Sequence, residues 1–295
     1  MQMYPTRIKN PGRRTSAEER KCTLSTCAPE VTMFDKPGDS FVKGIVILGC
    51  GSSMGVPLIN CDCNVCVSDN PKNIRNRSSI WIKDMGLSIV VDITPDFRAQ
   101  ALKHKITHID AIIITHAHYD HIGGLDDLRP YNKGCKIPAF MDLATLNDLK
   151  QKSPHLFKEY NTASIWPTTS LEPLVIDYYD KFKIKHLEFT AIKQTHGKIF
   201  SLGLRWGNNA YSTDFNYLEE NALNELKDLD LWIADAMSIN KFQTHVNLQE
   251  ALDYIKIIAP KRSILTHMSH EISYESIKPG SSKVVPAFDG LVIDC

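Results

Sequence analysis

The sequence predicts one layered α/β domain over residues 41–295. In this part of the chain, short apolar runs typical of buried strands alternate with amphipathic segments typical of helices. No Pro- or Ser-rich linker interrupts the alternation, and the sequence contains no internal repeat. A length of 295 residues would fit either two average domains or one large α/β enzyme domain. The unbroken alternation favours the single domain, with helices that cover the outer faces of its sheets.

The predicted strands and helices follow one another along the whole domain. Strand-like runs occupy residues 44–48, 79–82, 87–91, 111–114, 181–189, 199–206, 231–234, 263–265 and 290–293. Helical patterns occupy residues 95–104, 143–151, 217–226 and 248–258. Asn247 is placed as the N-cap of the last helix and Pro260 as its stop. So many strands predict sizeable sheets.

Residues 1–40 form a predicted extension outside this domain, because they show no sustained apolar period and cannot pack a core. Six of the first 21 residues are basic, as in organelle transit peptides. Glu18 and Glu19, together with the missing amphipathic pattern, instead favour a disordered tail. We therefore expect a cytoplasmic protein, with organelle targeting as the alternative.

The composition excludes several classes of protein. Hydrophobic residues make up 43% and charged residues 23% of the chain, which is typical of a globular protein with a substantial core. The 34 basic and 34 acidic residues cancel, so the chain lacks the broad positive charge of a dedicated nucleic-acid binder. No apolar run approaches the ~18 residues of a membrane-spanning helix. We expect neither nucleic acid nor a membrane as a partner.

The strongest chemical signal follows the apolar run at residues 111–114. His116, His118, Asp120 and His121 lie within six positions and are followed by two glycines. A buried strand that runs into such a loop places these side chains at a sheet edge, where the two-residue period lets His116 and His118 point the same way. Imidazole and carboxylate ligands suit Zn, Fe, Mn or Ni. Chance does not easily produce this cluster, so it predicts a metal site.

Three of the eight cysteines form a second pattern, Cys61-Asp-Cys63-Asn-Val-Cys66. No secretory signal precedes them in the sequence, so metal binding in a reducing compartment is favoured over disulfides. Three thiolates leave one position of a tetrahedral Zn²⁺ open, and a closed structural site needs a fourth protein ligand. His270 is our candidate for it. The alternative is three reduced cysteines with His270 at the surface.

The segment around His116 resembles the signature of the metallo-β-lactamase superfamily. The remaining ligands of that superfamily are a distant His, a bridging Asp and a final His, for which this chain offers His196, Asp214 and His267. The resemblance implies one metal held by His116, His118 and His196, a second held by Asp120, His121 and His267, and Asp214 as the bridge. It also implies a four-layer αβ/βα sandwich and two divalent metal ions in the catalytic site, Zn²⁺ or Mn²⁺.

One branch of this superfamily, the PhnP-like phosphodiesterases, is similar in further features over roughly residues 44–295. These features include the glycine-rich turn at residues 48–57, the three cysteines and the spacing His267-Met-Ser-His270. In this branch the second of these histidines completes the thiolate site. The resemblance therefore implies one structural Zn²⁺ bound by Cys61, Cys63, Cys66 and His270.

The resemblance to this branch implies hydrolysis of small phosphodiesters, among them cyclic phosphates of ribose or nucleosides. His245 matches a non-ligand active-site histidine of the branch, and the expected catalytic residues are His245, Asp120 and Asp214. A protonated imidazole near the leaving alkoxide can stabilise or protonate it, which is worth ~10²–10⁴-fold in rate. The alternative for His245 is plain packing beside the Asn247 cap.

Other functions stay open on the same scaffold: a tRNA 3′-processing nuclease, a thioesterase or lactamase, or a non-catalytic cofactor-biosynthesis protein of the PqqB type. Neutral charge disfavours the nuclease, and the complete ligand set disfavours the non-catalytic protein. The natural substrate and the assembly stay open as well, a homodimer included.

Four further residues have two interpretations each. Arg75, Arg77 and Arg129 are candidate phosphate contacts, with surface arginine as the default. Asp92 follows an apolar run directly and could hold a ligating imidazole through a hydrogen bond, or be an ordinary strand-end aspartate.

Overall fold

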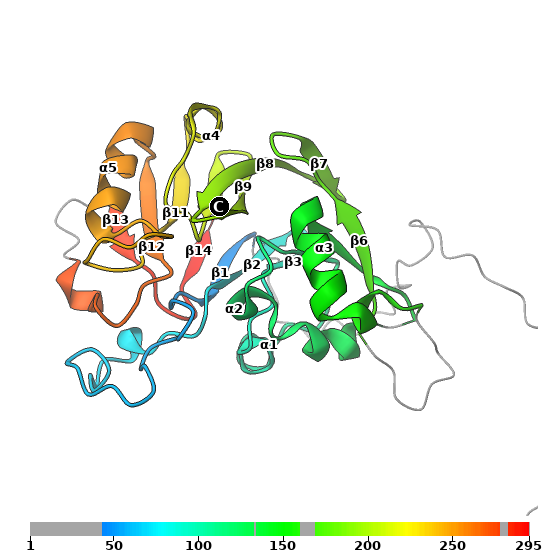
Figure 1. Ribbon diagram of the computed structural model, residues 1–295, viewed down its shortest axis with the longest axis horizontal. Helices are drawn as coiled ribbons and strands as arrows, with labels where there is room; N and C mark the ends of the chain where they lie inside the picture. Colours follow the sequence, from blue (N-terminus) through cyan, green and yellow to red (C-terminus); the bar gives the residue numbers. More distant parts are fainter. Residues whose placement is uncertain (1–42, 133, 160–168, 278–282, 295) are drawn as a thin grey trace, which may run out of the picture. The chain divides into compact units, whose positions relative to one another are not determined.

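Two mixed β-sheets stack face to face, and helices flank the outer side of each sheet (Figure 1). The computed structural model describes residues 43–132, 134–159, 169–277 and 283–294. The predicted N-terminal extension at residues 1–40 lies outside the described residues. Within them, each sheet has seven strands. These four layers confirm the predicted αβ/βα sandwich.

The first sheet has the strand order β14-β1-β2-β3-β4-β5-β6. Its strands are β1 (Gly44–Gly49), β2 (Ser79–Asp84), β3 (Leu87–Val91), β4 (Ala111–Ile113), β5 (Ile137–Met141), β6 (Leu171–Val175) and β14 (Val292–Asp294). Pairing is antiparallel from β14 to β3 and parallel from β3 to β6. β3 and β4 are buried throughout, as their largely apolar sequences predict.

The second sheet has the order β13-β12-β11-β10-β9-β8-β7. Its strands are β7 (Lys181–Ile184), β8 (Leu187–His196), β9 (Ile199–Trp206), β10 (Asn209–Ser212), β11 (Leu231–Asp235), β12 (Arg262–Thr266) and β13 (Val284–Pro286). The strands from β7 to β10 pair antiparallel, and those from β10 to β13 pair in parallel. The carboxyl ends of parallel strands meet at one edge of a sheet, which is where loops with functional side chains gather.

Helices connect many of these strands. They are α1 (Phe97–His104), α2 (Tyr119–Ile122), α3 (Leu143–Lys152), α4 (Glu220–Glu225) and α5 (Leu248–Ile258). Short 3₁₀ segments span Pro71–Asn73, Leu125–Tyr131, Pro154–Phe157 and Tyr274–Ser276. None of the helices that the structure describes is long and apolar enough to cross a membrane.

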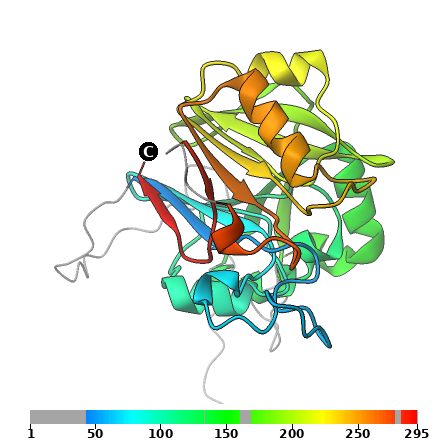
Figure 2. The same ribbon diagram turned by 90° about the vertical axis from the view of Figure 1, so that its left-hand side faces the viewer.

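The helix α5 begins and ends as predicted. The Asn247 side chain accepts a hydrogen bond from the backbone N–H of Glu250, and the Glu250 side chain accepts one from the backbone N–H of Asn247. The chain leaves the helix at Ala259 in the left-handed conformation, one residue before Pro260. Figure 2 shows α5 lying along the second sheet.

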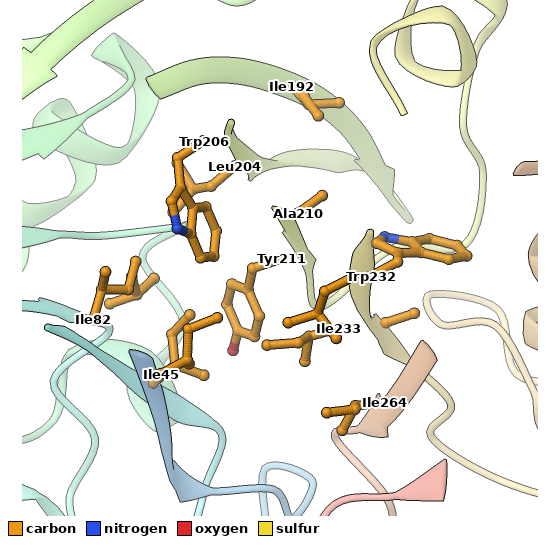
Figure 3. Close-up of a cluster of buried hydrophobic side chains, with 14 of the residues drawn as sticks. Ile45, Ile82, Ile192, Leu204, Trp206, Ala210, Tyr211, Trp232, Ile233 and Ile264 are labelled. Carbon is orange, nitrogen blue, oxygen red and sulfur yellow. The ribbon is translucent and has the colours of Figure 1, made fainter. Parts of the chain in front are cut away.

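Apolar side chains from both sheets fill the space between them (Figure 3). Ile45 and Ile82 of the first sheet share this core with Leu204 and Ile233 of the second, and none of the four is more than 2% exposed. Full burial of such a side chain stabilises the fold by ~1.5–3 kcal/mol. This core holds the two sheets together and thereby fixes the loops at their edges.

Some predicted elements differ from those observed. The single strand expected at residues 181–189 is the hairpin β7–β8, because Lys185 takes a left-handed φ of 52° and turns the chain. The helix expected at residues 217–226 shrinks to α4, because Tyr217 instead forms an extended bridge with Thr195. The prediction misses β5, β6, β10 and β13. The first, second and fourth of these contain proline, which argues against a strand, and β10 has only four residues.

Candidate metal centres and active site

The His-x-His-x-Asp-His segment leaves the first sheet at the end of β4. The backbone of His118 is still extended, and Asp120 and His121 lie in the helix α2 that begins at the next residue. Gly124 lets this loop approach its neighbour closely, since a Cβ at that position would lie 2.0 Å from the carbonyl oxygen of Thr94. The strand end and the tight turn together gather the side chains of the motif.

His116, His118 and His196 form a first cluster. Nε2 of His116 lies 2.9 Å from Nδ1 of His118, and Nε2 of His196 lies 3.3 Å from the same atom. His196 is the last residue of β8, so the second sheet delivers it. Three converging imidazole nitrogens can hold one divalent cation.

Asp120, His121, Asp214 and His267 form a second cluster, and all four residues are buried. Nε2 of His121 lies 3.2 Å from Oδ2 of Asp120 and 3.2 Å from Oδ2 of Asp214. Nε2 of His267 lies 3.4 Å from the same Asp214 oxygen and 3.8 Å from Oδ2 of Asp120. The donor atoms of a second cation site are thus within reach of one another.

The carboxylate of Asp214 lies between the two clusters. Its Oδ1 lies 3.8 Å from Nε2 of His116 and of His196, whereas its Oδ2 faces His121 and His267. Asp214 caps no helix in the described part of the chain, since α4 begins later with Glu219 at its N-cap. This position matches the bridging role that the resemblance implies.

Three residues of this region have strained backbones. Asp92, Asp214 and His267 take left-handed φ angles of 63°, 55° and 57°. Such conformations cost on the order of 1–3 kcal/mol in residues other than glycine. Each residue lies within two positions of a strand end, at β3, β10 and β12. Strained conformations also occur in turns elsewhere in the described chain, but these three belong to residues whose side chains meet at the candidate site.

Hydrogen bonds hold the imidazole rings in place. Oδ2 of Asp92 lies 2.7 Å from Nδ1 of His121, and the same carboxylate accepts hydrogen bonds from the backbone N–H and the hydroxyl of Thr115. The carbonyl oxygen of Thr244 lies 2.8 Å from Nδ1 of His196. Both contacts turn Nε2 of the ring toward the clusters, and Asp92 takes the supporting position that the sequence offered as one interpretation.

Burial and charge set the protonation of these groups. Burial lowers the pKa of His116 well below its usual value. Burial also disfavours the charged form of His267, but the carboxylates of Asp214 and Asp120 outweigh it and raise the pKa to about 9. For Asp214, burial raises the pKa, yet the imidazoles of His267 and His121 hold it well below its usual range. The second cluster is therefore an array of opposite charges.

The donor set fits a pair of divalent metal ions. In the part of the chain that the structure describes, Nε2 of His121 and Nε2 of His267 are buried near carboxylate oxygens but make no hydrogen bond, although buried polar groups normally do. Cations beside Asp214 would give both nitrogens a partner. Imidazole and carboxylate donors of this kind suit Zn²⁺ or Mn²⁺.

His245 lies beside the clusters. Its Nε2 faces Oδ1 of Asp214 at 3.8 Å, and its ring centroid lies 4.7 Å from that of His196. Its Nδ1 lies 2.8 Å from Oδ2 of Asp235, to which it can donate a hydrogen bond. Sequence reasoning missed Asp235. The signal that could have revealed it is its place directly after the apolar run at residues 231–234, which parallels that of Asp92.

Cys61, Cys63, Cys66 and His270 converge at a separate place. The three sulfur atoms lie 3.2, 3.4 and 3.7 Å from Nδ1 of His270, and all four residues are half-buried. A hydrogen bond from the backbone of Cys66 is the main cause that lowers the pKa of Cys63 to about 6. A thiolate is the form that binds metals, and three sulfurs with one nitrogen suit a tetrahedral Zn²⁺.

The loop after β12 carries ligands of both centres, His267 and His270. The backbone N–H of Met268, between them, donates to the carbonyl oxygen of Cys50 at 2.8 Å. Further along the loop, the buried guanidinium of Arg75 donates to the carbonyl oxygens of Ser269 and Ile272 at 3.0 and 2.8 Å. The loop is thus fixed at three points.

The three arginines predicted as candidate phosphate contacts all form hydrogen bonds or ion pairs within the protein. Arg75 is 1% exposed and holds this loop, so it is no phosphate contact. Arg77 pairs with Asp96 at 2.9 Å. Nε of Arg129 donates to the backbone carbonyl of Asp126.

Comparison with known proteins places the chain in a family. A family model described as "Beta-lactamase superfamily domain" matches residues 88–268. The octanoyltransferase of Porphyromonas gingivalis is 31% identical over 251 residues, which are 83% of this chain and 50% of that protein. The chain therefore spans about half the length of this relative.

Solved structures agree with this placement. A diphosphatase from the PhnP family is 32% identical with a TM-score of 0.78, and the match covers 84% of this chain and 95% of the other. Zn²⁺-bound PqqB from Methylobacterium extorquens is 18% identical with a TM-score of 0.67, over 85% of this chain and 99% of the other, and this likeness shows the fold alone. The chain belongs to the metallo-β-lactamase superfamily of metal-dependent hydrolases, in its PhnP-like branch.

Proposed function

We propose that the protein hydrolyses small phosphodiesters at a centre of two divalent metal ions, Zn²⁺ or Mn²⁺. One ion would be held by His116, His118 and His196, the other by Asp120, His121 and His267, and Asp214 would be shared. The observation that carries the proposal is the position of the Asp214 carboxylate, whose two oxygens face the two clusters.

The metal ions and the side chains have separate tasks in this proposal. A divalent pair supplies Lewis acidity, which activates water as a nucleophile and neutralises charge on phosphoryl oxygens. Asp92 and the carbonyl of Thr244 orient the rings of His121 and His196 through their Nδ1 atoms. Because these rings are held before substrate arrives, little reorganisation is needed during the reaction.

His245 is assigned to the leaving oxygen. Asp235 accepts a hydrogen bond from Nδ1 and fixes the orientation of the ring. Nε2 then faces the centre and can give a proton to the departing alkoxide, which is worth ~10²–10⁴-fold in rate. A thiolate leaves more readily without a proton, so this arrangement supports a phosphodiester over a thioester.

We also propose that Cys61, Cys63, Cys66 and His270 bind one Zn²⁺ with a structural role. The position of His270, within 3.7 Å of all three sulfurs, supports this over reduced cysteines with an unengaged surface histidine. With four protein ligands, such a site has no open position for a substrate.

A small molecule is the proposed substrate class. The zero net charge gives little support to a polynucleotide. A relative named as a diphosphatase of the PhnP family supports chemistry at phosphorus. The name octanoyltransferase describes a protein of which this chain spans half, so we carry over no acyl chemistry. Convergence of all seven ligand side chains supports catalysis over a non-catalytic PqqB-type role.

The test compares bis(p-nitrophenyl) phosphate with a lactam and a thioester, in the presence of Mn²⁺. The wild-type protein should turn over the phosphodiester fastest, and Asp214→Ala should lower its kcat/KM by on the order of 10³–10⁴-fold. Asp253→Ala removes an exposed carboxylate on α5 and is the matched control. Equal rates for wild type and Asp214→Ala would contradict metal-dependent catalysis. Faster turnover of the lactam or thioester would contradict the substrate class.

A further inference from the structure

Exposed aromatic residues lie close in the sequence to the residues of the candidate active site. Among the described residues, the strongly exposed aromatic side chains are Tyr119, Phe200, Tyr217 and Phe242, each more than 40% exposed. Each of them lies within four positions of a metal-binding residue or of His245. Exposed apolar groups that cluster in this way mark binding sites, whereas single ones scattered over a surface need no explanation.

The segments that carry three of these aromatics touch one another. Tyr217 pairs with Thr195 at the end of β8. The turn after β8 packs on the loop before α5, because a Cβ on Gly197 would lie 2.6 Å from the side chain of Thr244. These three segments therefore form one continuous rim, and each of them carries an exposed aromatic residue.

Phe242 lies nearest to the reaction chemistry in this rim. Its ring centroid is 6.1 Å from that of His245, with the ring planes tilted by 55°. The side chain is 52% exposed, so part of it is open to a ligand. The loop before it is fixed, since the backbone N–H groups of Ile239 and Asn240 donate to the carboxylate of Glu271. The backbone shortly before Phe242 is thus held in place independently of a ligand.

Lysines accompany the aromatic rings. Nζ of Lys193 lies 4.2 Å from the ring centroid of Phe200. Lys198 is exposed in the turn after β8. Lys241, next to Phe242, is also exposed and pairs with Glu250 at 3.3 Å. Aromatic faces beside ammonium groups suit a molecule that combines a planar ring with negative charge.

We propose that Phe242 forms a stacking subsite for the planar ring of a nucleoside phosphodiester, on the side of the leaving oxygen. The inference rests on the proposed phosphodiesterase function and names its substrate class. His245 faces the leaving oxygen, so a group attached to that oxygen passes close to the neighbouring Phe242. Stacking of one base on an aromatic side chain is typically worth a factor of about 5–150 in affinity.

The test uses two cyclic phosphates that share the reacting group and differ in the planar ring: adenosine 2′,3′-cyclic monophosphate and glycerol 1,2-cyclic phosphate. Phe242→Ala should lower kcat/KM for the adenosine compound about tenfold, mainly through KM, and leave the glycerol compound within about twofold. Phe242→Trp should retain activity on both. Phe242→Leu keeps an apolar side chain without a flat ring, so it should behave like Phe242→Ala.

The control is Ile257→Ala, which removes an exposed apolar side chain of α5 and should leave both substrates unaffected. Equal losses on both substrates in Phe242→Ala would overturn the subsite and leave the phosphodiesterase function standing. Wild-type turnover of bis(p-nitrophenyl) phosphate but of neither cyclic phosphate would overturn this inference alone, whereas turnover of none of the three would overturn the proposed function as well. A larger loss on an RNA with a 3′ trailer than on the adenosine compound would overturn the small-molecule subsite in favour of a polynucleotide.

Discussion

The two candidate metal-binding clusters of this protein are built in different ways. The candidate catalytic cluster draws its side chains from the ends of strands in both sheets, and six of the seven are buried. The thiolate cluster takes three half-buried cysteines from one loop between β1 and β2 and a single histidine from the loop after β12. Both clusters join elements of the two sheets, but the first is formed at strand ends, whereas the second fixes a long loop through three of its residues.

This difference predicts different consequences for the loss of each cluster. The core between the sheets holds the strand ends whether or not metal is bound. Loss of the catalytic ions should therefore remove activity and leave the fold largely intact. The loop of residues 50–78 contains little regular structure beyond one short 3₁₀ segment, so loss of the thiolate site should mainly lower stability.

The largest expected effect concerns the active site. His245→Ala should lower kcat/KM for adenosine 2′,3′-cyclic monophosphate about 10²–10⁴-fold, because the alkoxide must then leave without a proton. The loss on bis(p-nitrophenyl) phosphate should be much smaller, since p-nitrophenolate is a good leaving group. His186→Ala, which removes a surface histidine, is the matched control. Equal losses on the two substrates would rule out the leaving-group role.

The next effect concerns the thiolate site. Cys63→Ser should remove one bound Zn²⁺ per chain and lower the melting temperature by about 5–10 °C. Folded molecules should keep their turnover number, because the catalytic cluster does not use this sulfur. Cys135→Ser changes another half-buried cysteine and should leave zinc content and stability unchanged. Elemental analysis measures the zinc content, and calorimetry measures the melting temperature. An unchanged zinc content in Cys63→Ser would refute the assignment.

A substitution at Arg75 should affect both clusters together. Arg75→Met removes the donors to the carbonyl oxygens of Ser269 and Ile272, so the free energy of unfolding should fall by about 3 kcal/mol. Because this loop carries His267 and His270, metal content should fall at both centres. Arg77→Met breaks a more exposed ion pair with Asp96 and should cost at most about 1 kcal/mol. Metal loss at one centre alone would contradict the shared-loop account.

The smallest effect concerns Asp289, which contacts both ends of the loop of residues 50–78. Asp289 accepts hydrogen bonds from the backbone N–H groups of Cys50 and Asn76, and burial raises its pKa to about 6. The folded state therefore holds this proton more tightly than the unfolded state, whose pKa is near 4. The resulting stability is present below pH 4 and is lost as the pH rises through 6.

The side chain of Asp289→Asn cannot ionise, so comparing this variant with the wild type isolates the contribution of Asp289 to the pH dependence of stability. From pH 4 to 7, the unfolding free energy of the wild type should fall relative to that of the variant by about 1–2 kcal/mol, because part of the residue is exposed. Denaturant titrations with chelator present keep metal loss out of the comparison. Parallel pH profiles for the two proteins would contradict the raised pKa.

The sequence predicts most of the fold because buried strands leave a local signal. β3, β9 and α5 appear at their predicted bounds. Strands with little local signal, such as β6 with its proline, depend on pairing partners that are distant in the sequence. Tyr217 also depends on a distant partner. The sequence pattern predicts a helix at this residue, but its backbone is extended because it forms a bridge with Thr195.

For the site, the contiguous motif at residues 116–121 has enough local information to be recognised alone. His196, Asp214 and His267 become interpretable only through a family resemblance, since no local pattern relates them. The roles of Asp235 and Arg75 cannot be predicted from the sequence, because they depend on neighbours in space. Asp235 contacts His245. Arg75 donates hydrogen bonds to backbone carbonyl oxygens. A single acidic or basic residue has many ordinary explanations until those contacts are visible.

Anomalous X-ray scattering at the Zn and Mn absorption edges, from crystals grown with both ions, is the most direct test of the account. We predict two peaks on either side of the Asp214 carboxylate, and a separate Zn peak among Cys61, Cys63, Cys66 and His270. A single peak or none beside Asp214 would contradict the claim that side chains from both sheets converge on a pair of metal ions.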